Sequence, residues 1–246
     1  MRRDVQAVIL ILLGGAILRI SVGDTFLNYV KESMRPWLLA SGTILVVLGV
    51  LALIDVLRKG RAADDEETPH DEPHEHDAHD GHDHSHGPRA AWLLLLPVMA
   101  IFLVAPPALG AYAAARDTTN AIQPREAKAP PLPPGDPAQI SVSDYVGRAV
   151  WDEGTSLEGR SVEMTGFVTP NPAGGWWLTR LALTCCAADA IASKVQVLDT
   201  PDLPANTWVT VTGTWVPGGG TKSDTAIPLL EVSDVTQVPQ PTNPYE

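Results

Sequence analysis

The chain has 246 residues, 45% of them apolar, and a formal net charge of −12 from 17 Lys/Arg and 29 Asp/Glu. This negative charge disfavours polyanionic partners such as nucleic acids.

Three apolar segments dominate the first half of the chain. Residues 5–22 are mostly apolar and carry a single charge, Arg19; residues 37–54 form an uncharged run of 18, and residues 90–115 form an uncharged run of 26. Since about 20 helical residues cross a bilayer, these runs predict three transmembrane helices, two within residues 1–60 and a third at 90–115. No small-residue cleavage site follows Ile20, so we expect the first segment to be an anchor and not a removed signal peptide.

The basic residues predict the orientation of these helices. The first short loop contains Lys31 and Arg35. The N-terminus and the two ends of the loop at 61–89 carry more basic residues, namely Arg2, Arg3, Arg58, Lys59, Arg61 and Arg89. Under the positive-inside rule, the N-terminus and the loop at 61–89 face the cytoplasm. We therefore expect a multi-pass cell-membrane protein, in contact with lipid, whose C-terminal domain is extracytoplasmic.

Residues 64–87 contain every histidine of the protein among ten acidic residues. These histidines are His70, His74, His76, His79, His82, His84 and His86. Neutral imidazoles and carboxylates bind Zn²⁺ and similar divalent ions, so the tract predicts a flexible metal-binding strand. The alternative is a solvated acidic linker whose histidines only titrate near neutral pH.

The second half of the chain begins with a change in composition. Residues 116–137 are rich in proline and predict an extended spacer. Within residues 138–246, Ser141 or Ser143 is suited to cap a helix that ends near Trp151. Five short runs with alternating apolar residues follow, separated by Gly and Pro, and they predict a five-stranded OB-like barrel. The fold class is thus a membrane α-helical half followed by a mostly-β soluble domain.

The charge of this second half argues against nucleic acid, which an OB-like barrel would otherwise suggest. From Asp136 onward there are five Lys or Arg against thirteen Asp or Glu. A phosphate backbone would be repelled, so we expect no nucleic-acid partner.

Cys185, Cys186 and Asp189 are the chemically distinctive residues of the second half. A disulfide between adjacent cysteines is strained, and on a regular strand the two side chains would point to opposite faces. A bulge or turn would let both thiolates meet one soft ion, assisted by Asp189 or Asp199. The alternative is that both cysteines are small buried hydrophobic residues.

Several short motifs resemble a bacterial membrane-protein family whose members are described as permease subunits. They are Gly166-Phe167-Val168, Arg180, Cys185-Cys186-x-x-Asp189-Ala190 and Trp208-Val209-x-Val-x-Gly213. The resemblance implies membrane helices, a spacer and a barrel-like external domain. It also implies a partner, a multi-span permease encoded nearby.

We therefore expect an accessory subunit of an inner-membrane permease that handles divalent or thiophilic metal ions, Zn²⁺ among them. The alternative is a membrane-anchored metal-binding or metal-sensing protein without a transport role. An enzyme is not expected. The cysteines lack the two-residue spacing of thiol oxidoreductases, no histidine is available outside for a Ser-His-Asp set, and no phosphate-binding glycine loop is present.

Overall fold

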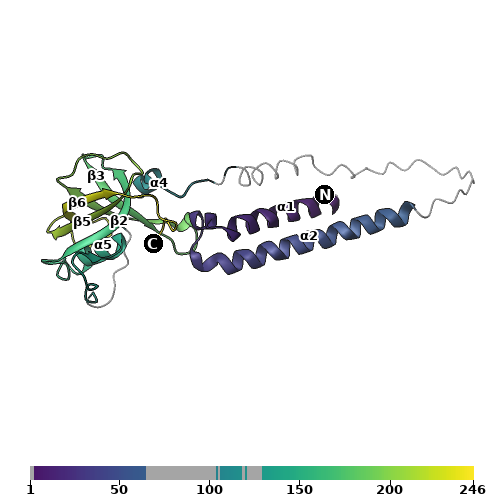
Figure 1. Cartoon of the computed structure of the whole chain (residues 1–246), viewed down its shortest axis with the longest axis horizontal. Helices are drawn as coiled ribbons and strands as arrows, with labels where there is room; N and C mark the ends of the chain where they lie inside the picture. The colour runs from purple at the N-terminus through teal and green to yellow at the C-terminus, as the bar shows by residue number, and fades with distance from the viewer. Residues whose placement is uncertain (1–2, 65–103, 105, 118–119, 121–128) are drawn as a thin grey trace, which may run out of the picture. The chain divides into compact units, whose positions relative to one another are not determined.

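The computed structural model describes residues 3–64, 104, 106–117, 120 and 129–246, and it divides the chain into two compact units. The first unit contains the helices α1 (Arg3–Val22) and α2 (Arg35–Asp64) (Figure 1). The second contains Leu27–Glu32 and everything from Pro107 onward. The seven predicted histidine ligands lie outside the described residues, as does the larger part of the third predicted transmembrane helix.

The helices α1 and α2 pack against each other through small residues. A Cβ atom built on Gly14 would lie 2.7 Å from the carbonyl oxygen of Gly42, and one on Gly49 would lie 3.0 Å from that of Ala7. The two backbones therefore approach more closely than larger side chains would allow.

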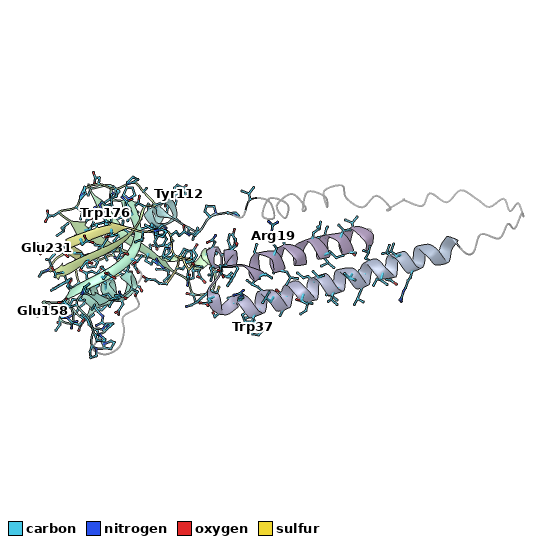
Figure 2. The ribbon with its side chains drawn as sticks, in the orientation of Figure 1. Arg19, Trp37, Tyr112, Glu158, Trp176 and Glu231 are labelled. Atoms are coloured by element: carbon cyan, nitrogen blue, oxygen red, sulfur yellow. The ribbon has the colours of Figure 1, made fainter. Side chains whose placement is uncertain are left out.

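The outer surface of this helical pair is apolar. Trp37, labelled in Figure 2, is 72% exposed, and Leu51 is 57% exposed. Two segments, Val5–Val22 and Glu32–Arg58, are long and apolar enough to cross a membrane. The described residues thus contain two of the three predicted spans, and both are compatible with membrane anchoring.

A closed five-stranded barrel forms the second unit, as expected. Its strands are β2 (Ser161–Pro170), β3 (Trp176–Ala182), β4 (Ile191–Leu198), β5 (Trp208–Val216) and β6 (Leu229–Gln237). The order is β2-β3-β4-β6-β5, and β5 pairs again with β2 to close the barrel. Within the barrel all pairs are antiparallel except β4 with β6. A short additional strand, β1 (Ala138–Gln139), pairs in parallel with β2. Closure removes the exposed sheet edges that would otherwise favour aggregation.

Alternating side chains from these strands fill the barrel interior. Val162 and Met164 on β2, and Val209 and Val211 on β5, are at most 1% exposed. Gly166 lies beside Phe167, the residue of β2 that pairs with Thr179 of β3, and a Cβ on Gly166 would come within 2.6 Å of the carbonyl oxygen of Thr179. The glycine therefore permits a close approach of the two backbones.

The helix α5 (Val142–Trp151) begins where the sequence predicts it. Ser141 is its N-cap, and its side-chain oxygen accepts a hydrogen bond of 3.0 Å from the backbone N–H of Asp144. The apolar face of α5 packs into the barrel core through Val142, Tyr145 and Val146, all fully buried. The phenol of Tyr145 also donates a hydrogen bond of 2.6 Å to the carbonyl of Leu229.

The third predicted transmembrane helix does not continue to residue 115. Residues 106–110 are not helical, and the short helix α4 (Ala111–Arg116) follows. Ala111 and Ala114 are buried with Phe167 of the barrel. Two prolines at 106 and 107 interrupt helical hydrogen bonding, which explains why the apolar run contains a break.

The described parts of the predicted spacer pack on the barrel. Leu132 contacts the core, and the carbonyl of Pro130 accepts a hydrogen bond of 2.7 Å from Arg148. Asn120 is 2% exposed, and its amide donates to the carbonyls of Lys194 and Ala226. These residues are part of the domain, because the barrel offers buried polar partners that a sequence pattern does not reveal.

Candidate metal centre

The loop between β3 and β4 carries the cysteine pair. β3 ends at Ala182, and the one-turn 3-10 helix η4 (Ala187–Asp189) follows Cys186 before β4 begins at Ile191. Cys186 has an extended backbone and is the N-cap of η4, and its carbonyl accepts a hydrogen bond of 3.0 Å from the N–H of Asp189. The two cysteines are therefore in a turn and not in regular strand geometry, as the convergent-thiol hypothesis requires.

Asp189 organises this loop through its carboxylate. Its Oδ1 accepts a hydrogen bond of 2.9 Å from the N–H of Thr184, and its Oδ2 accepts from the N–H of Cys185 at 2.8 Å and of Cys186 at 3.4 Å. Three successive backbone donors thus hold one carboxylate. This fixes the turn in which the two cysteine side chains lie.

The sulfur atoms of Cys185 and Cys186 and a carboxylate oxygen of Asp189 all lie within 4.8 Å of one another. Ligands about 2.3 Å from a tetrahedral Zn²⁺ are separated by roughly 4 Å, so a small adjustment would let all three contact one ion. Two thiols and a carboxylate are suitable ligands for a soft or borderline ion. Of the two acidic residues considered, the structure brings Asp189 to the cysteines, whereas Asp199 follows the far end of β4.

Both cysteines are free thiols that solvent can reach. Cys185 is exposed and Cys186 is half-buried. The alternative that they are buried core residues is therefore wrong. A turn on the barrel surface exposes them because the carboxylate of Asp189 satisfies the backbone N–H groups that a continuing strand would have paired.

The electrostatics of the loop keep a proton on Cys185. A hydrogen bond from its thiol to Asp189 raises the pKa of Cys185 to about 12, and proximity to Cys186 adds to the effect. The same hydrogen bond, supported by the backbone donors, lowers the pKa of Asp189 to about 2. Without metal, a proton on Cys185 therefore balances the negative charge that Asp189 and the two cysteines would otherwise concentrate at this turn. A bound metal cation would balance the same charge in place of the proton.

A segment that the sequence did not indicate lies against this loop. Leu27–Glu32, here called the connector, joins α1 to α2 and belongs to the barrel unit. Val30 and Cys186 form an antiparallel β-bridge, in which the N–H of Lys31 donates to the carbonyl of Cys185 at 3.1 Å and the N–H of Ala187 donates to the carbonyl of Tyr29 at 2.7 Å. Its sequence mixes apolar and polar residues and contains no motif that predicts this contact.

Two side chains reinforce the connector. Nζ of Lys31 donates to the carbonyl of Leu183 at 3.4 Å, which is a weak contact, and the phenol of Tyr245 donates to the carbonyl of Asn28 at 2.9 Å. The connector therefore contacts the barrel on both sides of the cysteine pair and through the C-terminal segment.

These features define a class of protein: a small closed β-barrel with an exposed thiol–carboxylate group, in a chain whose apolar helices are compatible with membrane anchoring. Residues 5–119 match the DUF1980 N-terminal domain, and residues 145–246 match the DUF1980 C-terminal domain. The chain therefore contains both domains of the DUF1980 family. No curated protein and no solved structure matched it. The expected two-part architecture is confirmed, and the role as a permease subunit stays a prediction.

Proposed function

We propose that this protein is a membrane-anchored accessory subunit that binds a divalent or thiophilic metal ion outside the membrane and works with a multi-span permease. The observation that carries this proposal is the convergence of Cys185, Cys186 and Asp189 on an exposed turn. Three protein ligands leave a coordination position open for water or for a ligand from another molecule. An open, exposed site is suited to exchange of its ion, in contrast to a closed structural zinc site.

The chemistry of Cys185 argues against a thiol redox enzyme. Catalytic thiols of that class have a lowered pKa, because the thiolate is the nucleophile. Here the hydrogen bond to Asp189 raises the pKa of Cys185. At neutral pH the Cys185 thiol therefore keeps its proton and is a poor nucleophile. A metal ion can displace this proton and then bind both the sulfur and the neighbouring Asp189 carboxylate, which favours a role in ion binding.

Three membrane crossings are part of the proposal. The connector, which follows α1 and precedes α2, is paired with the barrel at Cys186. If α1 and α2 each cross a bilayer, the end of α2 at Asp64 is on the side opposite the barrel. The chain then has to cross once more before Pro107, and the apolar run from Ala90 is the segment that fits.

This topology separates the two predicted ion-binding segments. The histidine tract at 64–87 would be cytoplasmic, and the cysteine turn would be extracytoplasmic, so the two could not share one ion. Two or three helices are too few to enclose an aqueous path, which is why the proposal includes a permease partner. The tract would then collect or deliver ions on the inner side.

Metal titration of the full-length protein in detergent, under reducing conditions, tests the proposal. We expect the double variant Cys185→Ser/Cys186→Ser to bind one Zn²⁺ fewer than the wild type. The matched control is Thr184→Ser/Ala188→Ser, which makes two changes at exposed positions of the same loop and keeps all three ligands. Equal Zn²⁺ stoichiometry in the wild type and the cysteine double variant would disprove the site.

Copurification tests the partner. We expect the wild type to retain a multi-span permease when it is solubilised from its native membrane in mild detergent. Full metal-dependent function in cells that lack any such partner would instead identify a membrane-anchored metal-binding or sensing protein.

A further inference from the structure

The connector contacts the backbone of the metal loop and not its ligand atoms. Its two hydrogen bonds enclose Cys186, one to the carbonyl of Cys185 and one from the N–H of Ala187. An ion held by the sulfurs of Cys185 and Cys186 would restrict the same stretch of backbone that forms this bridge. A bound ion and the paired connector would therefore both order the same stretch of backbone, from Cys185 to Ala187.

The connector is also continuous with the membrane segment. Lys31 is separated from the first residue of α2, Arg35, by Glu32, Ser33 and Met34, which form the 3-10 helix η2 (Glu32–Met34). A change in how firmly Lys31 is held would therefore reach the start of α2 through one short, structured turn.

We propose that the connector Leu27–Glu32 is the coupling element between the metal site and the membrane helices, with pairing of the connector strengthened when Cys185 and Cys186 hold an ion. The proposal rests on the metal site described above. By thermodynamic linkage, if the ion strengthens the bridge, then loss of the bridge weakens binding of the ion by the same factor. The structure thus assigns Lys31 as a positioning residue, which acts through its backbone N–H.

Proline substitution separates the backbone N–H from the side chain of Lys31. Lys31→Pro removes the N–H that donates to Cys185, whereas Lys31→Ala keeps this N–H and removes only the weak contact of Nζ with Leu183. Glu32→Pro is the matched control, since it adds a proline at the adjacent residue, the first of a 3-10 helix, and keeps the Lys31 N–H.

The experiment measures Zn²⁺ affinity of the full-length variants in detergent, with Cys185→Ser/Cys186→Ser as the blank for all other zinc sites. We expect Lys31→Pro to weaken binding by about three- to tenfold, the range that one net backbone hydrogen bond corresponds to, while Lys31→Ala and Glu32→Pro stay within about twofold of wild type. Equal affinities in all three variants would overturn the coupling while leaving the metal site intact. Absence of the cysteine-dependent site in the wild type would instead disprove the metal site itself.

Hydrogen exchange of the wild type gives a second measurement that needs no proline variant. We expect Zn²⁺ to slow exchange in peptides covering 27–34 and 183–190, and this effect to disappear in Cys185→Ser/Cys186→Ser. Peptides from α5 should not change. If Zn²⁺ slows exchange in the cysteine loop but not in the connector, the two are not coupled and the inference is wrong.

Discussion

The Asp189 carboxylate accepts a hydrogen bond of 2.8 Å from the backbone N–H of Cys185, and the same carboxylate is the largest cause of the raised pKa of the Cys185 thiol. One acidic side chain therefore shapes the turn and controls the protonation of its first cysteine. Replacing this carboxylate should change both the reactivity of the Cys185 thiol and the geometry of the turn. The first effect can be followed by itself through the rate at which Cys185 is alkylated.

Asp189→Asn should make Cys185 more reactive. The carboxylate is the largest of the causes that raise the pKa of this thiol, with Cys186 second, so a neutral amide should return the pKa toward the ordinary value for cysteine. We expect the alkylation rate of Cys185 at pH 8 to rise at least about tenfold in a Cys186→Ser background, because the thiolate fraction rises. The matched control Asp199→Asn, at an exposed acidic residue beyond the far end of β4, should leave the rate unchanged. An equal rate in both variants would show that Asp189 does not hold the proton.

Zinc binding at the cysteine turn should weaken on acidification because of the thiol and not the carboxylate. The pKa of Asp189 is lowered to about 2, so this group is ionised at every pH above about 4 and its hydrogen bonds are lost only as the pH falls through about 2. Cys185 is protonated throughout the neutral range and must release its proton to bind metal.

The affinity should therefore fall about tenfold for each pH unit between 8 and 6 from Cys185 alone. The measurement is a Zn²⁺ titration of a full-length variant in which all seven histidines are replaced by asparagine, so that the tract does not contribute. An affinity independent of pH over this range would contradict thiol ligation.

Single-cysteine labelling should reveal opposite sides of the membrane for the tract and the barrel. Ser85→Cys and Thr221→Cys are made separately in a Cys185→Ser/Cys186→Ser background and treated with an impermeant thiol reagent in intact cells. Thr221 is exposed on the barrel unit, and we expect only this position to react. Labelling of both positions would remove the third crossing from the topology, and labelling of Ser85 alone would reverse the orientation.

Glu246→Ala should destabilise the barrel through α5. The side-chain carboxylate of Glu246 accepts hydrogen bonds from the N–H groups of Val142 at 2.9 Å and Ser143 at 3.1 Å, both in the first turn of this helix. The loss of such a cap costs about 1 kcal/mol, which corresponds to a decrease of roughly 5 °C in Tm for a domain of this size. Thermal unfolding followed by tryptophan fluorescence tests this, with Glu231→Ala, at an exposed residue of β6, as the control. A similar Tm for both variants would mean that the cap contributes nothing.

Local patterns in the sequence were sufficient for α1, α2, α5 and the five strands of the barrel. Val162 and Met164 on β2, and Val209 and Val211 on β5, alternate as half-buried strands require, and Ser141 caps α5 where a helix start was expected. The contact of Cys185 with Asp189 could also be predicted from the sequence as one option, because the two residues lie four positions apart and a single turn brings them together. These features depend on neighbours in the chain, whose geometry is set by backbone periodicity.

Contacts between distant segments were decided only by the tertiary structure. The apolar run at 90–115 predicts one helix, but burial against Phe167 places Ala111 and Ala114 in the barrel unit. The connector gives no signal in its sequence, yet Lys31 contacts Leu183, 152 residues further along the chain. Once the barrel has closed, some backbone N–H and C=O groups are left without a hydrogen-bond partner, and these groups determine which distant segments pair with it. A local pattern of residue types does not contain this information.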